Sequence, residues 1–75
     1  MSKIPPFIDQ LDLSSRQKRR YAVSLAIAIL ERVRSAEDAN LDRFPLAFQD
    51  SDAFANAESS LDSLIDAIVT LDDCY

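Results

Sequence analysis

The clearest pattern of apolar and polar positions lies in the last third of the chain. Between residues 51 and 72, apolar side chains recur at alternating intervals of three and four residues, the a/d spacing of a helix that packs along one stripe. These residues are Phe54, Ala57, Leu61, Leu64, Ile68 and Leu71. Because Asp50 and Ser51 are both favourable N-caps, the pattern predicts an amphipathic helix over 51–72.

A second helix is predicted over residues 14–35. Ser14 and Gln17 match the S-x-x-Q capping box, in which each side chain satisfies a backbone donor of the other residue. Between Tyr21 and Leu30 only Ser24 is polar. A helix that faces a single partner needs only about three apolar positions per heptad. We therefore expect this part of the helix to be buried on most sides.

Residues 1–13 form a lead-in to this helix. Pro5 and Pro6 fix the backbone and favour an extended conformation before them. The spacing of Phe7, Ile8 and Leu11 suits a single helical turn laid over the end of a core. A free docking segment is the alternative interpretation.

Residues 36–50 are predicted to connect the two helices. Pro45 should interrupt any helix here and keep Phe44 out of the α region. We expect Phe44 and Phe48 to pack over the open end of the helix pair. The alternative is an exposed contact surface, because aromatic anchors are favoured at interfaces.

These elements predict an all-α fold, in which residues 1–75 form one domain built as an antiparallel two-helix hairpin. One hairpin cannot cover a helix that is apolar on most sides, whereas two hairpins can do so as a four-helix bundle. We therefore expect a homodimer; a monomer with the lead-in and connection folded over the first helix is the alternative. The expected core or dimer face comprises Tyr21, Leu25, Ile29, Leu61, Leu64 and Ile68.

Charge is distributed unevenly along the chain. All eight basic residues lie in residues 1–43 with six acidic ones, whereas residues 44–75 contain seven acidic and no basic residues. An antiparallel hairpin would bring the basic run at the start of the first helix beside Asp72 and Asp73, so we expect internal pairing. Binding of an external anion is the alternative. The run comprises Arg16, Lys18, Arg19 and Arg20.

Three acidic residues, Glu58, Asp62 and Asp66, follow one another at four-residue intervals and form a ridge on the second helix. We interpret this ridge as a solvated face of a protein whose net charge is −5. The alternative is an acidic surface that occupies a basic groove on a partner.

The composition argues against catalysis. The chain has no histidine, the commonest general base, and no glycine, on which phosphate-binding loops depend. Its one cysteine, Cys74, lacks a histidine partner and cannot close an intramolecular disulfide. We expect no enzymatic activity, cofactor or metal. The N-terminus does not resemble a signal peptide, so we expect a cytoplasmic protein without membrane contact.

The sequence favours a small acidic interaction module that acts as a regulator, adaptor or inhibitor by occupying a partner protein's surface. One alternative is a nucleic-acid-binding regulator that uses the basic run; its net charge of −5 opposes such binding. Another is a structural subunit of a larger assembly. The candidate partner-binding residues are Arg16, Lys18, Arg19, Arg20, Phe44, Phe48, Glu58, Asp62 and Asp66.

Overall fold

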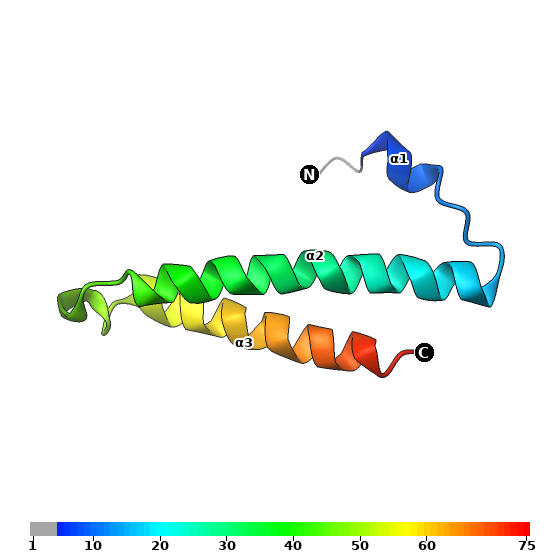
Figure 1. Cartoon of the computed structure of the whole chain (residues 1–75). Coiled ribbons are helices and arrows are strands. Elements are labelled where there is room, and N and C mark those ends of the chain that lie inside the picture. Colours follow the sequence, from blue (N-terminus) through cyan, green and yellow to red (C-terminus); the bar gives the residue numbers. More distant parts are fainter. Residues whose placement is uncertain (1–4) are drawn as a thin grey trace.

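A computed structural model describes residues 5–75, so the first four residues of the predicted lead-in lie outside it. The fold is all-helical, and its main feature is a pair of long antiparallel helices that pack against each other (Figure 1). The elements are α1 (Pro6–Asp9), α2 (Arg16–Asp42), a short 3₁₀ turn η1 (Leu46–Phe48) and α3 (Asp52–Asp72). The Cα radius of gyration is 16.0 Å, whereas a compact chain of this length would have about 11 Å.

The predicted capping box at the start of α2 is wrong by one residue. The N-cap is Ser15, whose Oγ accepts a hydrogen bond from the backbone amide of Lys18 at 3.1 Å. Ser14 is held elsewhere, because its amide and hydroxyl both donate to Asp12 Oδ1. Gln17 therefore does not stand at the third helical position, which a reciprocal capping box requires.

Helix α2 also continues beyond the predicted end at Ser35 and reaches Asp42. The prediction assumed that Pro45 would prevent helix formation over the whole connection. Proline restricts the residue before it, and α2 ends only at the C-cap Arg43, immediately before Phe44. Residues 36–42 include alanine, glutamate and leucine, which are good helix formers. The connection between the long helices is correspondingly shorter than 36–50.

The two long helices meet along one stripe on each, here called the seam. On α3 its members are the residues of the predicted a/d pattern, and all of them are half-buried or buried. Ile68, with 6% of its surface exposed, is the one buried side chain in residues 5–75. On α2 six half-buried positions follow the same alternation of three and four residues, and they are Val23, Ile27, Leu30, Arg34, Glu37 and Leu41. Ala22 and Glu31, which flank this stripe, are half-buried as well.

The loop end of the hairpin is closed by an aromatic contact. The rings of Phe44 and Phe54 meet edge to face, with centroids 5.2 Å apart and an interplanar angle of 74°. Ser51 caps α3 by accepting from the amide of Phe54 at 3.2 Å, and its hydroxyl donates to the Phe48 carbonyl at 2.6 Å. Phe44 thus packs as predicted, whereas the Phe48 side chain remains exposed.

The lead-in forms the predicted single helical turn, α1, but this turn does not cover the end of the core. Phe7 and Ile8 are exposed, and α1 stands apart from the helix pair (Figure 1). Only the second half of the lead-in approaches α2, as described below.

We expect Leu64→Asp to lower the free energy of unfolding by at least about 3 kcal/mol, because it places a charge in the seam. Circular dichroism during thermal and urea unfolding measures the change. Ser63→Asp is the matched control, since it adds the same charge at an exposed neighbouring position and should unfold like the wild type. A Leu64→Asp protein that unfolds together with this control would contradict the seam.

Candidate functional site

The hairpin leaves a second apolar surface of α2 uncovered. We define the outer face of α2 as Tyr21, Leu25, Ile29 and Val33, which follow one another at four-residue intervals and therefore form a continuous ridge. All four are exposed, and Tyr21 and Ile29 expose 66% and 63% of their surface. At 100° of helical rotation per residue, the centre of this ridge lies roughly 140° around α2 from the centre of the seam, with Tyr21 and Leu25 farthest from the seam and Val33 nearest to it. It consequently faces away from α3.

The predicted core or dimer face is thus divided between two surfaces. Leu61, Leu64 and Ile68 lie in the seam and pack within the hairpin. Tyr21, Leu25 and Ile29 lie on the outer face. The seam and the outer face could not be distinguished from the sequence, because almost every residue from 21 to 30 is apolar and both surfaces run through this segment of α2.

The lead-in adds a pocket at one end of the outer face. Leu11 and Leu13 lie opposite Tyr21, Ala22 and Leu25, and together with neighbouring polar residues they surround an open pocket of about 570 Å³. This pocket could not be predicted from the sequence, since Leu13 lies outside the spacing of the predicted turn and its distance from Tyr21 depends on how the lead-in folds back.

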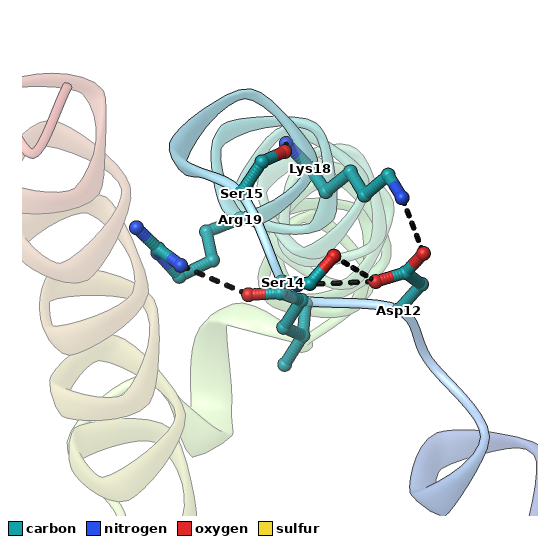
Figure 2. A network of polar contacts seen from close by, with 6 residues as sticks. Asp12, Ser14, Ser15, Lys18 and Arg19 are labelled. Carbon is teal, nitrogen blue, oxygen red and sulfur yellow. Dashed lines mark hydrogen bonds and ion pairs between the residues drawn. The ribbon is translucent and has the colours of Figure 1, made fainter.

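A polar network holds the lead-in beside the start of α2 (Figure 2). The ammonium group of Lys18 forms an ion pair with Asp12 Oδ2. Ser14 donates to the other oxygen of the same carboxylate through its amide (3.1 Å) and its hydroxyl (2.6 Å). The guanidinium of Arg19 donates to the Leu13 carbonyl at 2.9 Å. Two side chains of the basic run therefore position Leu11 and Leu13 next to the outer face.

The expected pairing of the basic run with the end of α3 is wrong. Within residues 5–75, no ion pair joins Arg19 or Arg20 to Asp72 or Asp73. The 27 residues of α2 against the 21 of α3 correspond to lengths of about 40 and 31 Å at about 1.5 Å per residue. As a result α3 ends short of the start of α2 (Figure 1).

The chain terminus bridges part of this difference in length. The guanidinium carbon of Arg16 lies 4.8 Å from the centre of the Tyr75 ring, a cation–π contact. Three of the four basic side chains in the run thus have partners within the chain. An external anion would have to compete with these contacts.

The other predicted partner-binding residues lie apart from the outer face. Glu58, Asp62 and Asp66 are all exposed along α3. Phe48 is exposed beside Leu46 in the turn at the loop end of the hairpin. On the flank of α3, Ile65 and Val69 border a smaller hollow of about 260 Å³. The structure therefore does not gather the predicted residues into one site.

No group of three or more His, Cys, Asp or Glu side chains in residues 5–75 is placed to hold a metal ion. None of the helices in this range combines the length and the apolarity that crossing a bilayer would require.

Comparisons with known proteins gave no match to a protein-family model, to a curated protein or to a solved structure. The surface of the molecule, and the outer face in particular, is therefore the evidence for function.

The hydrogen bonds to Asp12 give the lead-in a pH dependence. The ion pair with Lys18, followed by the hydroxyl and amide of Ser14, lowers the pKa of Asp12 below its usual value of 3.8. Since the folded pKa is below the unfolded one, the network stabilises the fold at pH values above 3.8 and is lost as pH falls through the folded pKa.

We therefore expect the amide chemical shift of Ser14, followed by NMR during acidification, to titrate below pH 3.8. Lys18→Gln removes the main cause of the shift and should move this titration upward. A titration that is the same in wild type and Lys18→Gln would show that the ion pair does not hold the lead-in in solution.

Proposed function

We propose that this chain is a helical interaction module, which acts as a regulator, adaptor or inhibitor by binding another protein through the outer face of α2. The observation that carries this proposal is the exposure of the ridge from Tyr21 to Val33 on the side of α2 that faces away from α3. Scattered exposed apolar residues are ordinary, but a contiguous apolar patch on a small domain is typical of an interaction site.

The composition of this surface supports the proposal. Tyrosine is among the residues that contribute most to binding energy at protein interfaces, and Tyr21 stands at the edge of the pocket beneath the lead-in. Leu25 borders the same pocket and connects it to Ile29 further along the ridge. Lys18 supplies a charged border at the start of the face. An apolar centre with a polar rim is the usual arrangement of an interface.

The extent of the exposed surface also supports binding. The chain exposes 6239 Å² to solvent, whereas a compact protein of this mass would expose about 4600 Å². A stable interface removes about 800 Å² from each partner. The surface in excess of a compact fold is therefore large enough for one such interface.

The proposal predicts that two charges on the outer face abolish partner binding. Leu25→Asp/Ile29→Asp should fail to retain a protein that the immobilised wild-type chain captures from a native extract of its source cells, with binding weakened about 100-fold or more. Quantitative mass spectrometry of the retained proteins measures the loss. Circular dichroism should show unchanged helix content, because both residues are exposed.

Leu46→Asp/Phe48→Asp is the matched control. It replaces two exposed apolar side chains with the same charges, but in the turn at the loop end of the hairpin. This control should retain the partner. Retention by all three proteins, or loss from the control alone, would contradict the outer face as the binding surface.

A further inference from the structure

We propose that the outer face of α2 binds a second copy of this chain, with the two α2 helices antiparallel and related by a two-fold axis. The inference rests on the proposed function, because it names one occupant of the same surface. Three features of the molecule support this occupant: the charge distribution along α2, the spacing of the ridge and the area that the hairpin leaves exposed.

The charges of α2 are complementary to those of an inverted copy. The helix begins with the basic run, whereas its last two turns contain Asp38 and Asp42, which lie outside the seam, in addition to Glu37 within it. In residues 5–75 none of these three carboxylates forms an ion pair. Two α2 helices packed in opposite directions would bring each basic start beside the partner's acidic end. A parallel pair would instead place the two basic runs together, which is unfavourable.

The outer face also matches itself under this symmetry. A two-fold axis at the level of residue 27 places Leu25 against the partner's Ile29, and Tyr21 against the partner's Val33. An isologous interface requires this kind of self-complementarity. Two of the four ridge members lie on either side of that level at matching distances, so each apolar side chain of one copy would lie level with an apolar side chain of the other.

The pocket under the lead-in fits the same arrangement. Tyr21 and Leu25 line it, and these residues form the part of the ridge that would face the partner's Ile29 and Val33. Its volume of about 570 Å³ can accept aliphatic side chains of this size. Leu11 and Leu13 would then cover side chains of the partner as well as the start of their own helix.

This arrangement differs from the four-helix bundle expected from the sequence. Because the centre of the outer face lies roughly 140° around α2 from the seam, α3 and the partner's α2 would occupy largely opposite sides of the helix. The two hairpins would thus join back to back, with both α2 helices in the centre and both α3 helices outside.

Sedimentation equilibrium tests the association. The wild-type chain should sediment at twice its mass of 8.4 kDa, and Leu25→Asp/Ile29→Asp should raise the dissociation constant about 100-fold or more. Leu46→Asp/Phe48→Asp should remain dimeric. A wild-type chain that is monomeric at high micromolar concentration, or a control that dissociates like the outer-face variant, would overturn the proposal.

Disulfide cross-linking tests the orientation, and it remains informative if the double aspartate variant does not fold. In a Cys74→Ser background, Tyr21→Cys and Val33→Cys chains that differ in length by a tag are mixed and oxidised. Antiparallel packing predicts mixed disulfides between the two chains. Homodimeric disulfides of Tyr21→Cys alone would indicate parallel packing and overturn the proposed symmetry.

The two proposals fail in different ways. If the wild type is monomeric but the outer-face variant loses a captured protein of different sequence, the second copy is the wrong occupant and the interaction module stands. If the wild type is dimeric through the outer face and every captured protein is retained by that variant, self-association stands and binding of another protein through this face is refuted.

Discussion

The seam between α2 and α3 is the contact on which the rest of the molecule depends. Two helices can bury only one stripe on each, and in residues 5–75 this arrangement buries a single side chain, Ile68. The ridge on the other side of α2 must then remain open in one isolated hairpin. The exposed outer face is thus a direct result of placing an apolar helix in a fold with only one neighbouring helix of comparable length.

The unequal lengths of the two helices determine the surroundings of this face. Since α3 ends before the start of α2, the basic run is not covered by the acidic end of α3 (Figure 1). Lys18 and Arg19 instead hold the lead-in, and Arg16 contacts Tyr75. The basic side chains that were expected to stabilise the hairpin therefore position the lead-in beside the outer face. The carboxylates in the last turns of α2 have no ion-pair partner in residues 5–75.

The sequence predicted the helices and the seam of α3 because polar residues separate its apolar positions and make the spacing visible. The seam of α2 was not resolved, since Val23 and Ile27 alternate with Tyr21 and Leu25 in a nearly continuous apolar run. The end of α2 was misplaced because a proline acts on its immediate neighbours rather than on a whole connection. The predicted pairing of the basic run with Asp72 and Asp73 was wrong because it depends on the relative lengths of the two helices. The predicted end at Ser35 made the first helix too short.

The lead-in and any chain bound to the outer face share the same two side chains, Tyr21 and Leu25. An exposed ion pair such as that between Lys18 and Asp12 contributes little to stability, so the segment it holds can adjust its position at small cost. Two groups that contact one surface influence each other's affinity by equal amounts. Residues 11–13 would consequently take part in the proposed binding equilibrium, and removing them would change how tightly the outer face holds its occupant.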